Sequence, residues 1–192
     1  MSLPEGLVYR SDFVTVDEER ELLDQLDAME FREIVMRGQT ARRVTRHFGL
    51  DYDYETFKVT PTEPLPQELE WLRSRAAELV GRQADALAEI LITRYPPGAP
   101  IGWHRDAPSF DKVIGISLGA AARMRFQRGK AAEREVAELV LEPRSAYVLD
   151  GPARTQWQHS IPPVKELRYS VTFRTLRARG GPRSTRSRGT AA

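Results

Sequence analysis

The sequence predicts a mainly β domain with flanking helices, an α+β chain whose core is a double-stranded β-helix, or jelly-roll. Two helix-like segments lie in the first half of the chain, and a series of short strand-like segments follows residue 89. Short strands separated by proline, glycine or charged turns favour an antiparallel sandwich or barrel with helices packed outside. The length of 192 residues suits a single domain with a sizeable core.

Residues 15–30 predict the first helix. Thr15 and Glu18 have the spacing of a capping box, in which each side chain bonds the backbone N–H of the other residue. Apolar residues then recur at helical spacing, so one side of the helix can face the core. This apolar stripe consists of Leu22, Leu23, Leu26 and Met29.

A second helix is predicted over residues 67–80. Pro64 and Pro66 precede it, and Gly81 follows it, which is the arrangement expected at the two ends of a helix. Between the two helices, residues 42–54 alternate like a strand and then turn.

The segments after residue 89 look strand-like and are separated by proline, glycine or charged turn residues. A jelly-roll built from them would have a mouth where side chains from several strands converge. The segments are 89–95, 112–119, 123–128, 136–142, 145–150, 154–161 and 167–176.

Composition excludes several kinds of chemistry. The chain has no cysteine, so it has no disulfide, no thiolate nucleophile and no Cys-ligated zinc or iron–sulfur centre. Any metal must therefore be held by histidine and carboxylate. No apolar run approaches the roughly 18 residues of a membrane span. Because the first residues lack the apolar stretch of a secretory signal, we expect a cytoplasmic protein.

The net charge of +2 conceals an uneven distribution. Residues 177–192 carry five arginines and no acidic residue, which leaves the rest of the chain near −3. We expect this segment to be a disordered basic tail, because it is rich in Gly, Ser and Arg and poor in large apolar groups. Such a tail can dock on phosphate backbones or serve only as a solubilising end, and the sequence favours neither.

Three side chains suggest a metal site. His104 and Asp106 lie two positions apart, so on an extended segment they project to the same side. His159 falls in the strand-like segment 154–161. Two histidines and one carboxylate can occupy one face of an octahedral Fe(II) and leave three positions open. The His-x-Asp pair taken alone has a simpler interpretation as a surface accident.

The segment 167–176 suggests an anion site. Its apolar and polar residues alternate strictly, and Arg168 and Arg174 fall on the polar face with Ser170 and Thr172. A guanidinium binds a carboxylate in bidentate fashion and keeps its charge, so this face suits a dicarboxylate. The alternative is a strand whose arginines face solvent.

Taken together, these motifs resemble the AlkB family of Fe(II)- and 2-oxoglutarate-dependent dioxygenases. The resemblance covers roughly residues 90–174, with a looser similarity in "RRVTRHFG". The matching segments are "ITRYPPGAPIGWHRD", "IGISLGAAARMRF", "LEPRSAYVLDGPARTQWQHSI" and "RYSVTFR".

The resemblance implies Fe(II), 2-oxoglutarate and O₂ as cofactor and co-substrates. It assigns the metal to His104, Asp106 and His159, and these are also the catalytic residues. It places the far carboxylate of 2-oxoglutarate at Arg168, and the keto-acid end near Arg174. The remaining co-substrate residues it implies are Tyr95, which matches the family tyrosine, and Thr93 and Ser170, which stand where the family has asparagine.

The implied reaction is the oxidative demethylation of alkylated nucleobases in DNA or RNA, as in nucleic-acid repair. Residues 44–54 and the spacing in residues 151–161 also look like the tRNA-modifying branch of the family, so a tRNA nucleoside is an alternative substrate. A protein side chain, or a binding module with a vestigial site, are further alternatives. Pro108 replaces the acidic residue with which the repair enzymes help to recognise the base. We expect the protein to act as a monomer.

The predicted substrate contacts are Trp157, Arg154 and Arg43. Trp157 would share the inward side of His159, although a core tryptophan is an equal alternative. The arginines would bind phosphates, or would simply be solvated. We expect residues 1–89 to be an extension that forms part of a substrate lid, and residues 90–176 to be the catalytic core of the same domain.

Overall fold

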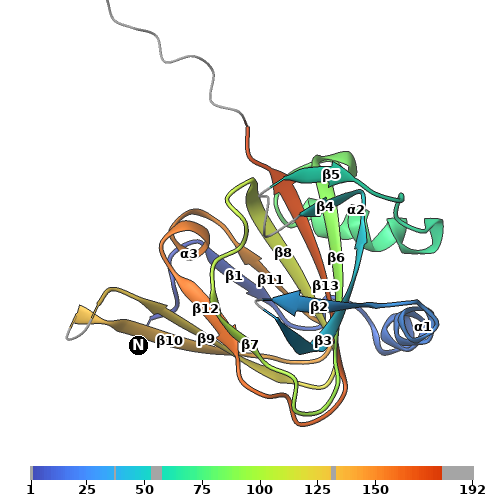
Figure 1. Cartoon of the computed structure of the whole chain (residues 1–192). Coiled ribbons are helices and arrows are strands. Elements are labelled where there is room, and N and C mark those ends of the chain that lie inside the picture. The colour runs from blue at the N-terminus through green and yellow to red at the C-terminus, as the bar shows by residue number, and fades with distance from the viewer. Residues whose placement is uncertain (1, 37, 53–57, 131–132, 179–192) are drawn as a thin grey trace, which may run out of the picture.

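The computed structural model of the chain describes residues 2–36, 38–52, 58–130 and 133–178. Figure 1 shows two layers of strands, with two helices against the outer side of one layer. The helices are α1 (Val16–Asp27), α2 (Glu70–Glu78) and α3 (Gly151–Thr155), with 3₁₀ turns at Gln67–Leu69 and Ala84–Ala86. In the described part of the chain no helix is both long and apolar enough to cross a membrane.

The larger sheet has seven antiparallel strands in the order β1-β11-β8-β13-β6-β3-β2, and the smaller has four in the order β10-β9-β12-β7. The two facing sheets confirm the predicted jelly-roll core. A small third sheet joins β4 to β5. The strands are β1 (Leu7–Arg10), β2 (Arg32–Met36), β3 (Gln39–Phe48), β4 (Leu50–Tyr52), β5 (Val59–Pro61), β6 (Leu87–Tyr95), β7 (Ile101–His104), β8 (Phe110–Gly119), β9 (Ala122–Arg128), β10 (Glu135–Leu141), β11 (Ser145–Leu149), β12 (Gln158–Ile161) and β13 (Arg168–Leu176).

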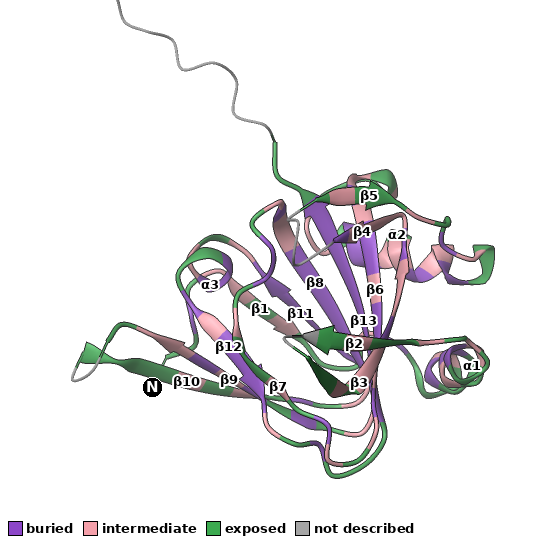
Figure 2. Cartoon of the chain, viewed as in Figure 1, coloured by how far each residue is buried: buried purple, intermediate pink, exposed green. Residues whose placement is uncertain are grey.

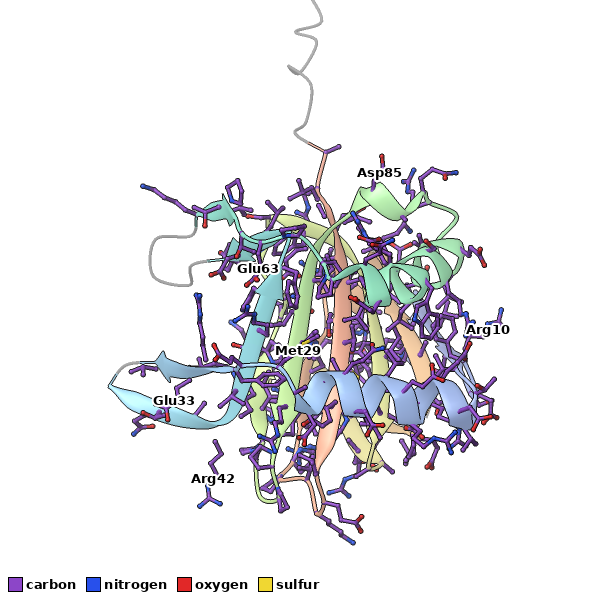
Figure 3. All side chains as sticks on the ribbon, turned by 90° about the vertical axis from the view of Figure 1, so that its right-hand side faces the viewer. Arg10, Met29, Glu33, Arg42, Glu63 and Asp85 are labelled. Atoms are coloured by element: carbon purple, nitrogen blue, oxygen red, sulfur yellow. The ribbon has the colours of Figure 1, made fainter. Side chains whose placement is uncertain are left out.

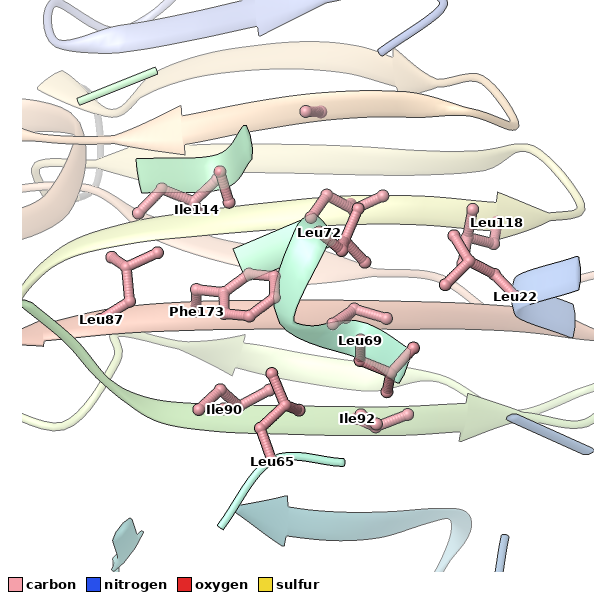
Figure 4. Close-up of a cluster of buried hydrophobic side chains, with 14 of the residues drawn as sticks. Leu22, Leu65, Leu69, Leu72, Leu87, Ile90, Ile92, Ile114, Leu118 and Phe173 are labelled. Atoms are coloured by element: carbon pink, nitrogen blue, oxygen red, sulfur yellow. The ribbon is translucent and has the colours of Figure 1, made fainter. Parts of the chain in front are cut away.

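Helices α1 and α2 cover the outer face of the larger sheet and form the main core with it (Figure 3). Figure 4 shows Leu69 and Leu72 near Phe173 of β13, and Leu65 beside Ile90 of β6. Full burial of each such side chain stabilises the fold by roughly 1.5–3 kcal/mol. The same packing explains Figure 2, in which β8, β13 and β6 are buried and the edge strands β2 and β10 are largely exposed.

Helix α1 forms as predicted. Thr15 is its N-cap and accepts a hydrogen bond from the backbone N–H of Glu18, while the Glu18 carboxylate accepts one from the N–H of Thr15 at 2.8 Å. Leu22 and Leu26 are buried, and Leu23 and Met29 pack at the edge of the same core. The helix ends at Asp27, three residues before the predicted limit.

The second predicted helix begins as a 3₁₀ turn and continues as α2. Gly81, which the sequence places after the helix, adopts a φ of +61°, a conformation that glycine reaches without steric cost. The boundary expected at residue 89 falls inside β6. Since β1 pairs with β11 and β3 with β6, the first 89 residues contribute strands to the larger sheet itself.

The segment 154–161 is predicted as one strand, and this prediction is wrong for the first residues of the segment. Residues Gly151–Thr155 form helix α3, with Asp150 as N-cap and Pro152 in its first turn, and β12 begins only at Gln158. The other predicted strands are confirmed within a few residues at their ends. The structure adds β1, β2, β4, β5 and β7, of which β4 stands where residues 42–54 were expected to turn. Residues 53–54 of that segment lie outside the described residues. Of the predicted disordered tail, residues 179–192 lie outside the described residues.

Candidate active site

A cavity of about 680 Å³ opens between the two sheets. This volume is in the range of small-molecule sites. The larger sheet contributes the polar face of β13 together with residues of β6, β8 and β11, and the smaller sheet contributes residues of β7, β9 and β12. Strands β2, β3 and β4 form a further wall. These strands belong to residues 1–89, whose role as part of a substrate lid stays a prediction.

His104 and His159 meet because β7 and β12 pair with these two residues directly opposite each other. Their ring centroids are 4.2 Å apart. Asp106 follows β7, and its Oδ2 atom lies 3.7 Å from Nε2 of His159. The Nδ1–H of His104 donates to the carbonyl oxygen of Gly102 at 2.8 Å, which leaves Nε2 of His104 as the lone-pair atom.

Burial favours neutral imidazoles here. Desolvation, followed by the neighbouring His104, lowers the pKa of His159 to about 3. Desolvation also lowers the pKa of His104. For Asp106 desolvation alone would raise the pKa, but Arg174 and the two imidazoles together hold it below its ordinary value. At neutral pH the group is therefore two neutral imidazoles and one carboxylate, the protonation states that a divalent metal requires of its ligands.

Asp106 presents one oxygen to this group. Its Oδ1 atom accepts hydrogen bonds from Nε and Nη2 of Arg174 at 3.0 and 2.7 Å. Its Oδ2 atom is buried and has no hydrogen-bond partner among the described residues. A buried carboxylate oxygen without a partner is costly unless a cation or donor meets it. The orphaned oxygen beside two neutral imidazoles thus fits a divalent metal.

The three side chains are gathered but do not form a closed coordination sphere. In the described ranges, no three His, Asp or Glu side chains stand around a common point at ligand spacing. The rings of His104 and His159 are tilted by 58° and contact each other. Binding a metal would require the rings to turn, while the backbone pairing of β7 and β12 already sets their separation.

Arg168 provides the second part of the site. Its side chain is fully buried, Nε donates to Oγ of Ser117 at 3.1 Å, and the guanidinium lies 5.0 Å from the ring centre of Tyr95. Among the described residues, neither Nη atom has a hydrogen-bond partner. A buried guanidinium with two unused donors fits a carboxylate, which accepts both in parallel.

The other predicted co-substrate residues are arranged as cross-strand pairs. In the pairing of β13 with β6, Arg168 lies opposite Tyr95 and Ser170 lies opposite Thr93. Tyr95, Thr93 and Ser170 all line the cavity. Residues directly opposite on one face of an antiparallel pair have neighbouring side chains, so the buried Arg168 adjoins the polar residues that line the cavity.

Among the predicted substrate contacts, only Arg43 lines the cavity. Its charge is close enough to contribute to the lowered pKa of His104. Arg154 does not lie on the substrate side, and that prediction is wrong. Its side chain is buried, and Nη2 donates to the carbonyl oxygens of Ala107 and Phe110 at 2.6 and 2.9 Å. Because α3 turns it inward, Arg154 holds the loop that carries Asp106.

The prediction that Trp157 lines the cavity is also wrong. Trp157 is buried in a second hydrophobic cluster with Phe126 and Ala153, and the guanidinium of Arg128 lies 4.8 Å from its ring centre. It precedes β12, so the alternation that places His159 inward does not extend to it. Trp103 is the tryptophan at the cavity, where it is partly exposed beneath Arg125.

Two residues that the sequence analysis did not single out, Glu89 and His47, also lie at or beside the site. Glu89 is buried on β6 and accepts a hydrogen bond from Nη1 of Arg174 at 2.7 Å. His47 on β3 lines the cavity, with Nδ1 3.5 Å from Oε1 of Glu89. A lone acidic residue at the head of the apolar run "EILI" was a signal for a buried ion pair.

The family comparison matches this geometry. Residues 6–179 match the model described as the 2OG-Fe(II) oxygenase superfamily. The chain belongs to this superfamily. Several of its curated relatives carry AlkB-type names, which confirms the resemblance to the AlkB family.

Two of these relatives are from Mus musculus. The tRNA (carboxymethyluridine(34)-5-O)-methyltransferase ALKBH8 is 32% identical over 171 residues, which cover 85% of this chain and 25% of the relative. The DNA oxidative demethylase ALKBH2 is 33% identical over 143 residues, which cover 67% of this chain and 58% of the relative. The chain thus spans about a quarter of the length of ALKBH8 and little more than half of ALKBH2.

The solved structure of OsALKBH1 shares the fold. It superposes with a TM-score of 0.69 at 14% identity and covers 91% of this chain and 99% of its own.

Proposed function

We propose that this chain is a 2-oxoglutarate-dependent dioxygenase that oxidatively demethylates alkylated nucleobases in DNA or RNA. The observation that carries the proposal is one cavity that holds two neutral imidazoles and a carboxylate with an unpartnered oxygen, while the buried guanidinium of Arg168, with unused donors, packs against the cavity residue Tyr95. The family match to 2OG-Fe(II) oxygenases supports this interpretation of the cavity.

Fe(II), when bound by His104, Asp106 and His159, supplies the oxygen chemistry: 2-oxoglutarate and O₂ yield succinate and CO₂, and one oxygen atom enters a substrate C–H bond. When that carbon is a methyl group on a ring nitrogen, the hydroxymethyl product releases formaldehyde and leaves N–H on the base. The protein's part is to bind and orient the reactants and to exclude water.

The residues divide this work between them. Arg168 would hold the far carboxylate of 2-oxoglutarate through both Nη groups, beside Tyr95, Thr93 and Ser170. Arg174 holds Oδ1 of Asp106, so the carboxylate would hold the metal through its other oxygen.

The substrate side would lie at the wall formed by β2, β3 and β4, where the cavity is lined by arginines. Arg43 is placed to contact a phosphate. Arg46, by contrast, already pairs with Glu63 at 2.6 Å. A base in a duplex must leave the stack to reach such a cavity, so the substrate is flipped out or single-stranded.

The similarity to ALKBH8 favours a second candidate, a tRNA nucleoside, since that relative is named for a tRNA modification. Pro108 replaces an acidic residue of the repair pattern, and this replacement fits the recognition of a different base. A cytoplasmic location and a monomeric state stay predictions.

The decisive experiment incubates the protein with Fe(II), ascorbate and 2-oxoglutarate and offers it methylated DNA, methylated RNA, bulk tRNA or methylated peptides. Mass spectrometry should show loss of methyl groups from one nucleic acid, with succinate and formaldehyde in equal amounts. The His104→Ala and Asp106→Ala variants should remain folded and form no succinate. Full turnover by either variant, or methyl loss only from the peptides, would rule out the proposal.

A further inference from the structure

Glu89 is a buried carboxylate behind the candidate metal site. Only 1% of its surface is exposed, and it lies directly opposite Arg174 in the pairing of β6 with β13. Its Oε2 atom accepts a hydrogen bond from Nη1 of Arg174 at 2.7 Å. A buried glutamate is rarely retained in a strand without a strong partner, because desolvating a carboxylate costs several kcal/mol.

Arg174 joins Glu89 to Asp106. Its Nε and Nη2 atoms both donate to the same oxygen of Asp106, while Nη1 donates to Glu89. A guanidinium that meets a single carboxylate prefers a fork in which two donors engage both oxygens. Here the second carboxylate takes Nη1, and the fork does not close over both oxygens of Asp106.

The consequence for Asp106 is geometrical. Oδ1 is held by Arg174, and Oδ2 is left without a hydrogen-bond partner among the described residues, 3.7 Å from Nε2 of His159. Glu89 does not reach this region itself, because its contacts are with Arg174 and, at 3.5 Å, with His47. Its influence on the candidate metal site therefore passes through Arg174.

We propose that Glu89 is a positioning residue: by holding Nη1 of Arg174, it keeps Asp106 turned so that a single free oxygen binds the divalent metal. This inference rests on the proposed function, because it presupposes the metal site. Loss of the Glu89 charge would let Arg174 turn and engage both oxygens of Asp106. The carboxylate would then compete poorly for the metal.

The test measures Co(II) binding without turnover, by titrating the anaerobic protein and recording the visible absorption of the bound ion. Glu89→Gln should weaken Co(II) binding by about 10- to 100-fold, the usual cost of removing a partner that orients a ligand. Its absorption bands should also shift, because Asp106 would bind in a different way. Wild-type affinity together with wild-type bands would overturn the inference.

Glu19→Gln is the matched control. Glu19 is also a buried glutamate paired with an arginine, Arg144 at 3.5 Å, but it lies on α1 away from the cavity. We expect this variant to bind Co(II) within about twofold of the wild type. A general effect of removing a buried carboxylate would instead weaken both variants equally, and that result would also overturn the inference.

The wild type and the His104→Ala variant distinguish a failure of the proposed function from a failure of the inference on Glu89. If the wild type binds Co(II) no more tightly than His104→Ala, the proposed function is wrong, whatever the result for Glu89→Gln. If the wild type binds tightly, His104→Ala binds weakly and Glu89→Gln behaves like the wild type, only the inference on Glu89 is wrong.

If Glu89→Gln does not fold, Glu89→Asp replaces it, because this variant keeps the charge on a shorter side chain. It should shift the Co(II) bands with a smaller loss of affinity. Unchanged bands would count against the inference.

Discussion

Arg168 and Arg174 lie on the same face of β13, both are buried, and their surroundings differ completely. Arg174 donates to two carboxylates of the protein, Asp106 and Glu89, both at 2.7 Å. Arg168 bonds one hydroxyl, that of Ser117, and neither of its Nη groups has a partner among the described residues. One guanidinium is therefore neutralised by the fold, while the other is left for an anion from outside.

The difference shows how the same residue type serves structure and binding within one strand. Removing one member of a buried ion pair leaves the other charge uncompensated, whereas removing a buried charge that has no partner relieves the fold of a cost. Both positions hold a buried arginine, so only the hydrogen-bonding partners decide whether the side chain serves the fold or the binding of a ligand. The predictions that follow test this contrast, beginning with the largest expected effect.

Arg174→Met should destabilise the protein by about 3–5 kcal/mol, because it leaves two buried carboxylates without their cation. Urea unfolding at neutral pH measures this loss as a lower midpoint with an unchanged slope. The double variant Arg174→Met with Glu89→Gln should recover part of it, since one of the stranded charges is then absent. A single variant as stable as the wild type would contradict the ion-pair network.

Arg168→Met should leave the free energy of unfolding within about 1 kcal/mol of the wild type, or raise it. Its effect should appear in binding: the apparent KM for 2-oxoglutarate should rise about 100-fold, close to 2.7 kcal/mol at 1.36 kcal/mol per factor of ten. The wild type should gain thermal stability when 2-oxoglutarate is added, and the variant should not. A variant that is severely destabilised but binds 2-oxoglutarate normally would reverse the comparison.

Arg154→Met tests a third buried arginine, which within the described part of the chain donates to the carbonyl oxygens of Ala107 and Phe110. We expect a loss of about 2 kcal/mol, since buried carbonyl groups lose charged donors but no carboxylate is stranded. Faster amide hydrogen exchange in residues 105–110 should accompany the loss, because this loop is what Arg154 holds. Binding of oligonucleotides should stay unchanged. Selective loss of nucleic-acid binding would restore the rejected role of Arg154 as a substrate contact.

The smallest effect on stability is expected for Arg75→Ala, which removes the partly exposed ion pair between Arg75 and Glu18. The hydrogen bond from Arg75 is the main cause that lowers the pKa of Glu18 from 4.5 to about 2. A carboxyl with a lowered pKa in the folded state stabilises the protein above pH 4.5, and this stability is lost as the pH falls toward 2. The variant should be less stable by about 1 kcal/mol at neutral pH and equal to the wild type near pH 2. Chemical unfolding along this pH series measures the difference. An equal loss of stability at neutral pH and near pH 2 would show that the ion pair does not cause the loss.

Much of the site could be predicted because it depends on local alternation. On an extended chain, residues two apart face the same side, which groups His104 with Asp106, and Arg168 with Ser170 and Arg174. The cavity and the order of the strands bear out these shared faces. Alternation failed at residues 154–161, because α3 interrupts the strand and turns Arg154 and Trp157 into the protein.

The sequence by itself determined the fold class, the capped helix α1, the polar and apolar faces of β13 and the residue types available to hold a metal. Each follows from spacing along the chain and from side-chain chemistry. Only the tertiary structure decided which charges meet: Arg174 finds Glu89 across 85 positions and Asp106 across 68, while Arg168 finds no carboxylate among the described residues. The energy of a buried charge depends on its partners, and strands that are distant in the chain supply them.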